Sequence, residues 1–548
     1  MAQAESPAQQ FRPLSVEHSR TLAKEKDDSH SEHTTTAEAG DGIVQKSKFK
    51  LAFVVFGLSI SSFLVGLDNT IISTAIPKIT DQFHALADVG WYASSYLLTT
   101  CAFQLTWGKL YTFFSVKWAY LVALLIFELG SLICGVAPNS ATLVVGRAIA
   151  GVGTAGVNSG AYLLVAHSVS QRHRPILLGL VGGMYGFAAI AGPLLGGAFT
   201  DNEKLTWRWC FYINLPLGLI TALVVVAFVS ISDNTNRSSS GLIDLLGQID
   251  IPGTGALLPA VVCFVLALQW GGTKYSWDNA RVIVLLSITG VLFILFIIIQ
   301  IRRGERATVP PRIFGNRNIW GSAIFGACLI SSFFVMLYYI PIWFQAIKGA
   351  SPVKSGIMNL PMVVSFVVFA ALAGALSSVV GYYVPFVYLS VIFTAVGTGL
   401  LSTLEPDSGP ARWIGYQVLF GMGIGLGLQA PVTAAQTALP LQDIAVGTSV
   451  VIFAETLAGS VMVSISQNVF TNRLVGNLGI YAPALDPSVV LNGGATQLDA
   501  LVPSDRYDQV LVAYNKSLAE TFYVSVALAC CSILGAVWLQ WLCVKGKT

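Results

Sequence analysis

The sequence predicts an all-α polytopic membrane protein with fourteen transmembrane helices, and three observations support this fold class. The chain has 548 residues and a mean hydropathy of +0.69. Apolar residues make up 54% of it and charged residues only 11%, whereas a soluble protein carries about 25% charge. Fourteen apolar runs approach the roughly 20 residues that a helix needs to cross a bilayer. Too few polar side chains remain to cover a soluble core, so a soluble globular protein is excluded.

The first 50 residues differ from the rest of the chain. They are polar, with a Ser/Thr/His/Glu cluster and few aromatics, and cannot bury enough apolar surface to order themselves. We therefore predict a disordered cytoplasmic tail at 1–50. A signal peptide is not expected, because no short apolar segment lies near Met1. The predicted spans follow at 51–74, 91–111, 118–137, 141–166, 175–199, 210–231, 251–269, 282–301, 319–344, 355–378, 384–403, 412–433, 445–470 and 522–543.

Basic residues next to the spans predict the topology. Lysines precede the first span and follow the last, and an even number of spans places both termini on one side. Because Lys and Arg favour the cytoplasmic side, that side and the second tail, 544–548, are predicted to be cytoplasmic. The arginine-rich loop at 302–317 agrees with this orientation. We expect a multi-pass protein of the plasma membrane, with a vacuolar or vesicle membrane as the alternative.

The one long loop, 471–521, is predicted to lie outside. It contains the sequon Asn515-Lys516-Ser517, which makes Asn515 a candidate for N-glycosylation.

A faint internal repeat predicts how the spans are grouped. Gly108-Lys109-Leu110 is followed 266 residues later by Gly374-Ala375-Leu376, and the same offset carries the fifth span onto the thirteenth. The chain is therefore divided into an N-terminal six-helix half at 51–231, a linker with two inserted helices at 232–318, and a C-terminal six-helix half at 319–543. Two similar halves around a central site are typical of transporters.

Four ionisable residues lie within predicted spans: Asp68, Glu128, Arg147 and Glu455. Each costs several kcal/mol in the bilayer unless it faces protein or water, roughly 2.5 to 3.5 on insertion scales. Asp68 could serve proton coupling or gating, or could sit at a hydrated helix end. Arg147 is seven residues into its span and could act in coupling or extend its side chain to the interface. Glu128 and Glu455 could be coupling carboxylates or neutral buried acids.

Glycine patterns in the fourth span do not indicate nucleotide chemistry. Gly151, Gly153 and Gly156 match G-x-G-x-x-G, but that fingerprint needs a preceding strand and an acidic residue about 20 positions on. Close helix packing is the better interpretation. The chain also contains no G-x-x-x-x-G-K-[ST] loop, so a gradient or a partner, not ATP bound by this chain, is expected to supply the energy.

The fifth span contains a proline among glycines: Gly186, Gly192, Pro193, Gly196 and Gly197. A proline inside a helix removes a hydrogen bond and kinks it, and flanking glycines let a neighbouring helix pack closely or slide. This pattern alone leaves a hinge and tight packing equally open.

Four segments together resemble the major facilitator superfamily, and specifically its fourteen-span drug:H+ antiporter branch. They are LDNTIISTAIP at 67–77, GRAIAGVGTAG at 146–156, GFAAIAGPLLGGAFTD at 186–201 and WRWCFYINLPLG at 207–218. Within that branch the chain looks most like fungal multidrug and toxin efflux pumps.

The resemblance implies roles for individual residues. It ties Asp68 and Arg147 to proton coupling and makes the five fifth-span residues the antiporter motif. The family's cytoplasmic loop pattern, G-x-L-A-D-R-x-G-R-K, departs here to GKLYTFFSVKW, with Thr112 in the aspartate position. The resemblance therefore gives no firm expectation of a charge-paired latch at that loop.

We predict a proton-coupled secondary transporter that exports a toxin, drug or other amphipathic secondary metabolite. The partners expected are a small-molecule substrate, protons and the lipid bilayer, with no nucleic acid and no obligate protein partner. No metal or cofactor is expected, because the eight cysteines lack metal-ligand spacing. An importer or facilitator of a small organic molecule, such as a siderophore-like compound, is the alternative. An integral-membrane enzyme is a distant one, since only His84, His167 and His173 offer candidate groups.

Overall fold

The computed structural model describes residues 48–84, 88–202, 204–229, 250–272, 275–483, 485–492, 502–503 and 505–545. These residues form helices joined by turns and loops, with an isolated bridge between Gly271 and Tyr275 and no strand. The predicted all-helical fold class is confirmed. Of the predicted tails, only the last three residues of 1–50 and the first two of 544–548 belong to the described part of the chain.

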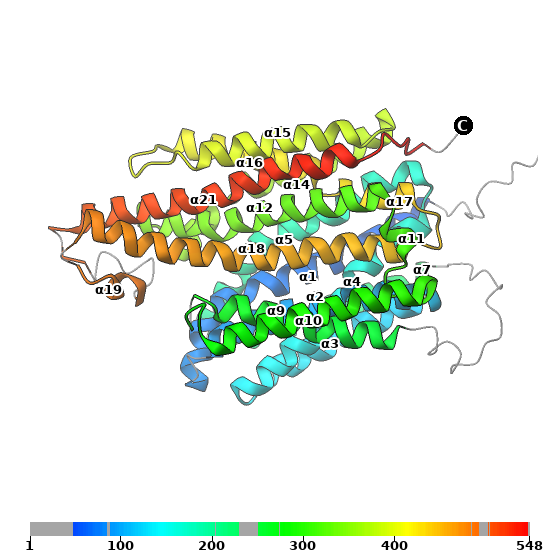
Figure 1. Cartoon of the computed structure of the whole chain (residues 1–548), viewed down its shortest axis with the longest axis horizontal. Coiled ribbons are helices and arrows are strands. Elements are labelled where there is room, and N and C mark those ends of the chain that lie inside the picture. The colour runs from blue at the N-terminus through cyan, green and yellow to red at the C-terminus, as the bar shows by residue number, and fades with distance from the viewer. Residues whose placement is uncertain are drawn as a thin grey trace, which may run out of the picture. The chain divides into compact units, whose positions relative to one another are not determined.

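The described helices fall into three groups along the chain, and most of the long helices are labelled in Figure 1. The first group contains α1 (Lys48–Phe83), α2 (Val89–Phe113), α3 (Val116–Gly135), α4 (Ser140–Ser168), the 3-10 helix η2 (Gln171–His173), α5 (Arg174–Asp201), α6 (Trp209–Tyr212) and α7 (Asn214–Phe228). The second contains α9 (Ile251–Trp270), α10 (Ala280–Arg303), the 3-10 helix η3 (Gly304–Arg306) and α11 (Pro311–Phe314). The third contains α12 (Arg317–Lys348), α13 (Pro352–Met358), α14 (Leu360–Val380), α15 (Val384–Leu401), α16 (Pro410–Gly427), α17 (Ala430–Ala438), α18 (Ile444–Tyr481), α19 (Pro487–Asn492) and α21 (Tyr507–Trp538).

Thirteen helices of the described residues are long and apolar enough to cross a membrane, and α2 is the remaining long helix. Its 25 residues are less hydrophobic because several polar side chains face the protein. Thr99 donates to the Ala148 carbonyl at 2.8 Å, and Thr100 donates to that of Gly151 at 3.1 Å. With its polar groups bonded to α4, α2 is suited to cross the bilayer and to complete the predicted set of fourteen spans.

The apolar core divides along the same lines as the helix groups. One cluster of buried side chains runs from Phe325 to Val544 and joins the helices from α12 to α21, which we call the C-terminal bundle. A second cluster, between Leu67 and Phe211, lies wholly within α1–α7, which we call the N-terminal bundle. A third lies mostly in the N-terminal bundle but includes Ile444 and Ile452 of α18. The inserted helix α9 packs on α10, α2 and α18.

The two bundles contact each other near one membrane face. We call this face the inner side; it carries residues 114–115 and 304–316, and the sequence predicts it to be cytoplasmic. Arg174 at the start of α5 donates to the Gln436 carbonyl at 3.4 Å, and the Gln436 amide donates to the Tyr162 carbonyl at 3.2 Å. Ser449 of α18 donates to Ser159 of α4 at 3.3 Å. These bonds join the inner parts of α4, α5, α17 and α18.

Glycines bring helices of the N-terminal bundle close together. A Cβ atom at Gly153 would lie 2.6 Å from the Ala123 carbonyl of α3, and one at Gly156 would lie 2.7 Å from the Trp107 ring of α2. Both distances are too short for a side chain, so these positions require glycine. The G-x-G-x-x-G pattern in α4 therefore serves helix packing, as the sequence predicts.

Helices α18 and α21 take up about half of the predicted outer loop at 471–521. Helix α18 continues to Tyr481, and α21 begins at Tyr507 and ends at Trp538, so the last span is not the predicted 522–543. The prediction failed because the first turns of α21 are too polar to resemble a span. They are nevertheless helical, with Val510 and Leu518 buried and Asp508 exposed, an amphipathic pattern that packs one face on its neighbours.

A buried ion pair as the candidate functional site

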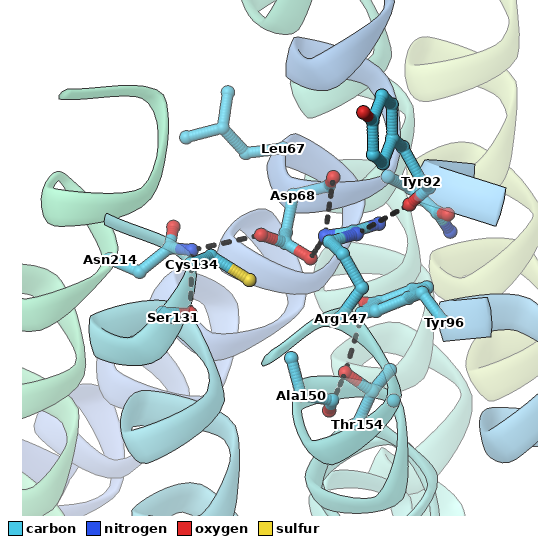
Figure 2. A network of polar contacts seen from close by, with 12 residues as sticks. Leu67, Asp68, Tyr92, Tyr96, Ser131, Cys134, Arg147, Ala150, Thr154 and Asn214 are labelled. Atoms are coloured by element: carbon cyan, nitrogen blue, oxygen red, sulfur yellow. Dashed lines mark hydrogen bonds and ion pairs between the residues drawn. The ribbon is translucent and has the colours of Figure 1, made fainter. Parts of the chain in front are cut away.

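Asp68 of α1 and Arg147 of α4 form a buried ion pair (Figure 2). The Asp68 side chain is 0% exposed and that of Arg147 is 1% exposed. Arg147 Nη1 donates to Asp68 Oδ2 and also lies 3.5 Å from the Asp68 carbonyl oxygen. The structure thus brings together the two residues that the sequence singles out for proton coupling, although they are 79 positions apart.

Two further groups, both from α2, hold the Arg147 guanidinium in place. Its Nε donates to the Tyr92 carbonyl at 2.9 Å. The Tyr96 ring lies against it, with the ring centroid 4.2 Å from Cζ, which is a cation–π geometry. The Tyr96 hydroxyl in turn accepts a hydrogen bond from Thr154 at 2.9 Å. Both tyrosines belong to α2, so the arginine joins three helices of the N-terminal bundle.

Asn214 supports the carboxylate from the other side, as Figure 2 shows. Its Nδ2 donates to Asp68 Oδ1 and to Ser131 Oγ, each at 3.1 Å, and its side chain is fully buried. Sequence reasoning missed this residue, because an uncharged amide in a span costs less than a charge and is not distinctive. The signal that could have found it is its place in the segment at 207–218, at the start of α7.

The charge balance of this site depends on one proton. While Asp68 is ionised, the pair is neutral, and both oxygens of its carboxylate accept hydrogen bonds. A proton on Asp68 would leave the Arg147 charge uncompensated in a buried site, and breaking such a pair costs about 3 to 5 kcal/mol. The site can therefore link proton binding to a rearrangement of α1 against α4.

The other two ionisable residues lie apart from the pair. Glu128 of α3 faces Gly218 of α7, with its Cγ 3.1 Å from where a Cβ of that glycine would stand, and both its carboxyl oxygens are buried without a hydrogen-bond partner. Glu455 of α18 packs in the same way on Gly326 of α12, and its Oε1 is buried without a partner. The structure therefore separates the predicted residues into one ion pair and two acids that form no ion pair with it.

The five residues of the α5 motif have three different environments. Gly186 faces the C-terminal bundle, where a Cβ would lie 3.2 Å from Cζ of Phe366. Gly192 and Gly196 instead face α1: a Cβ would lie 2.9 Å from Cβ of Thr70 in the first case and 2.7 Å from the Ile71 carbonyl in the second.

The remaining two motif residues are Gly197 and Pro193. Gly197 has nothing within 4 Å of its Cβ position, and Pro193 lies within the helix, which continues through it from Arg174 to Asp201.

The N-glycosylation predicted at Asn515 conflicts with its surroundings. Asn515 lies within α21, where its Oδ1 accepts from Trp343 Nε1 at 2.7 Å and its Nδ2 donates to the Leu404 carbonyl at 3.1 Å. Ser517 of the same sequon is completely buried. Because a glycan is attached through Nδ2 and needs an open surface, this geometry argues against that modification.

An ionic network around Asp250 lies at the inner side. Asp250 precedes α9, and its carboxylate accepts from Gln300 at 2.7 Å, from the Gly253 amide at 2.9 Å and from the Thr308 amide and hydroxyl at 3.0 Å each. Burial raises the pKa of Asp250, but these hydrogen bonds outweigh burial, so the pKa lies below its ordinary value. The carboxylate fastens the first turn of α9 to the segment that follows α10.

That segment also contacts both bundles. Lys109 of α2 donates to the Ala307 carbonyl at 2.7 Å and to that of Glu305 at 3.3 Å. Arg312 of α11 donates to both carboxylate oxygens of Asp443, at 2.7 and 3.1 Å, next to the start of α18. The inner ends of α2 and α18 are thus joined through residues 305–312.

Comparisons with known proteins agree with this architecture. A family profile described as Major Facilitator Superfamily matches residues 58–463. The MFS-type efflux pump MFS1 of Trichophyton rubrum is 52% identical, covering 96% of this chain and 97% of its own. The efflux pump aflT of Aspergillus parasiticus is 46% identical, covering 93% of this chain and 99% of its own. Among solved structures, a double-tryptophan mutant of XylE matches 92% of this chain and 98% of its own, at a TM-score of 0.59 and 14% identity.

Proposed function

This chain belongs to the major facilitator superfamily and is a multi-pass membrane transporter, and on that premise we propose that it exports an amphipathic organic molecule, such as a toxin or other secondary metabolite, in exchange for protons. Relatives close to 50% identical over nearly the whole chain are named efflux pumps, which supports export over import. The plasma membrane is the location that we propose.

The contacts between the bundles support alternating access. In this structure the bundles are joined at the inner side, through Arg174 with Gln436, Gly108 against Ser449, and the 305–312 segment. A substrate could not pass between α2 and α18 there while these contacts hold. The arrangement corresponds to a state closed toward the predicted cytoplasm, and transport requires a second state in which these contacts separate.

The observation that carries the proposal is the fully buried Asp68–Arg147 pair. Asp68 lies in the outer part of α1, so its proton is taken up from the outer side in this proposal. Protonation would release the guanidinium from its only carboxylate partner in this site. The helices of the N-terminal bundle would then move so that the charge of Arg147 is stabilised by other groups. The free energy that drives the inner side open is thereby taken from the proton gradient.

A transport assay in proteoliposomes tests this proposal. Fluorescent amphipathic dyes serve as probes, a trapped pH indicator reports proton movement, and a protonophore removes the gradient. The parental protein should concentrate at least one dye against its gradient only while the pH gradient is present. Asp68→Asn should abolish this concentration, whereas Asp407→Asn, which makes the same change at an exposed outer position, should not. Dye accumulation by the parental protein that is insensitive to the protonophore would contradict proton coupling.

A further inference from the structure

Glu128 is a buried acid for which the ion pair of Asp68 and Arg147 leaves no role. Both of its carboxyl oxygens are buried, and neither has a hydrogen-bond partner in the described part of the chain. An ionised carboxylate in that position would pay a large desolvation cost that no donor offsets. In this state of the protein, Glu128 therefore holds a proton.

The position of Glu128 relates it directly to the ion pair. On α3, Glu128 lies one helical turn to the inner side of Ser131, and on α7 its neighbour Gly218 lies one turn to the inner side of Asn214. Ser131 and Asn214 are hydrogen-bonded to each other, and Asn214 is bonded to Asp68. The two acids therefore sit at successive levels along the contact between α3 and α7, with Glu128 nearer the inner side.

Gly218 makes room for the Glu128 side chain. A Cβ at this position would overlap the carboxyl group of Glu128. Helix α3 packs against α4, α6 and α7. Because position 218 is a glycine, the Glu128 side chain can lie in the contact between α3 and α7 and does not have to point toward the lipid. The acid is thus held within the bundle without a hydrogen bond to hold it.

The charged groups that face this site are few. Asp68 of α1 and Arg147 of α4 lie at the next level outward, and the α6 and α7 sequences contain no charged residue. Lys117, on α3 itself, is at the inner end, where it donates to the carbonyls of Val226 and Val229 at 2.8 Å each. At the outer end, Arg208 donates to the carbonyls of Gly135 and Ala137. Lys109 of α2 is engaged at the inner side by the carbonyls of residues 305 and 307.

We propose that Glu128 is a second proton-carrying carboxyl that takes the proton from Asp68 and passes it toward the inner side. This inference rests on the proposed proton-coupled export. When the inner side opens, Glu128 first releases the proton that it holds in the present state. The O–H bond at protonated Asp68 then breaks, and a new O–H bond forms at the ionised Glu128. Asp68 becomes ionised again and re-forms its pair with Arg147. One proton therefore crosses toward the inner side for each cycle of the two acids.

The decisive variant is Glu128→Gln, which keeps the shape and neutrality of the protonated acid but cannot carry a proton. In the proteoliposome assay, Glu128→Gln should lower substrate-dependent proton movement at least tenfold. When dye is present on both sides of the membrane and there is no pH gradient, the rate of dye exchange by Glu128→Gln should stay within twofold of the parental rate. Glu128→Asp, which restores a titratable group, should recover part of the proton movement. Glu405→Gln, the same change at an exposed outer loop, is the matched control.

The outcomes separate this inference from the function on which it rests. If the parental protein moves no protons with substrate, the proposed function fails. If substrate-dependent proton movement is the same in the parental protein and in Glu128→Gln, only the role of Glu128 is overturned. Should Glu128→Gln fail to reach the membrane while Glu128→Asp reaches it, the inference is also overturned, because a neutral amide ought to replace a neutral acid in the fold.

Discussion

Gly196 of α5 packs against Thr74 of α1, and both residues belong to the N-terminal bundle. A Cβ at Gly196 would also lie 2.7 Å from the Ile71 carbonyl and 3.0 Å from Cγ1 of the same residue. The outer part of the α5 motif is therefore a contact within one bundle and not a surface that slides on the other. Gly186, three turns toward the inner side, is the motif residue that meets the C-terminal bundle.

The first prediction follows from the Gly196 contact. Gly196→Leu should destabilise the N-terminal bundle by about 1 to 3 kcal/mol, the usual cost of overpacking, because the α1 backbone cannot yield to the new side chain. We expect a lower melting temperature in detergent and less protein in the membrane. Gly197→Ala is the control: its Cβ position is open, so both values should stay at the parental level. A Gly196→Leu protein of parental stability would show that α1 and α5 are not packed in this way.

The second prediction concerns Gly186 and Phe366, which meet across the two bundles. Gly186→Val should push the Phe366 ring of α14 and oppose closure of the inner side. A cost of about 1 to 3 kcal/mol would shift the ratio of the two access states roughly 5- to 150-fold. A cysteine introduced at Ala370, buried in the α5–α14 contact, should then react faster with a maleimide in inverted vesicles. An unchanged labelling rate, with the protein correctly folded, would mean that the ring moves without separating the bundles.

The third prediction concerns Asp250 and pH. Its pKa in the folded protein lies below the ordinary value of about 3.9, so its contribution to stability is complete above that pH and is lost only as pH falls through the folded value. Asp250→Asn should lower stability by about 1 to 3 kcal/mol, because buried donors lose their acceptor. The difference in melting temperature between this variant and the parental protein should be constant from pH 5 to pH 8. A difference that grows or shrinks across that range would show that Asp250 titrates near neutrality.

The fourth prediction concerns the pair formed by Arg312 and Asp443. The Arg312 side chain is half exposed, at 51%, so the interaction should be worth about 1 kcal/mol or less. In a double-mutant cycle of Arg312→Ala and Asp443→Ala, the coupling between the two changes should alter the Ala370-cysteine labelling rate by about fivefold or less. A larger coupling would mean that this pair, and not the packing of α5 on α14, holds the inner side closed.

Much of the fold could be predicted because lipid imposes length and hydrophobicity on each span. The apolar runs at α10, α14 and α15 have the length and hydrophobicity of a span, so they are predicted without difficulty. The ends of helices are harder to predict, since beyond the lipid a helix needs only one apolar face. This is why the sequence predicts a loop at the first turns of α21, and a glycan at Asn515, whose side chain is bonded to Trp343.

The candidate site divides in the same way. Asp68 and Arg147 can be singled out from the sequence because a charge in a span is costly, whereas their ion pair is visible only in the structure. Asn214 and Asp250 did not stand out: the first is an uncharged amide, and the second lies just before a span, where an acid is ordinary. Their importance comes from hydrogen-bond partners that are far away in the sequence, such as Ser131 and Thr308, and no local pattern identifies these.

Helix α18 is long enough to extend beyond the bilayer. Its 38 residues, at about 1.5 Å per residue, span about 57 Å, whereas a bilayer with its headgroups is about 40 to 45 Å thick. Two or more helical turns therefore stand in water, and the adjoining start of α21 does so as well. An affinity tag inserted after Asp486 would be held clear of the headgroups on this helical stalk, where an antibody applied to unbroken cells could detect it.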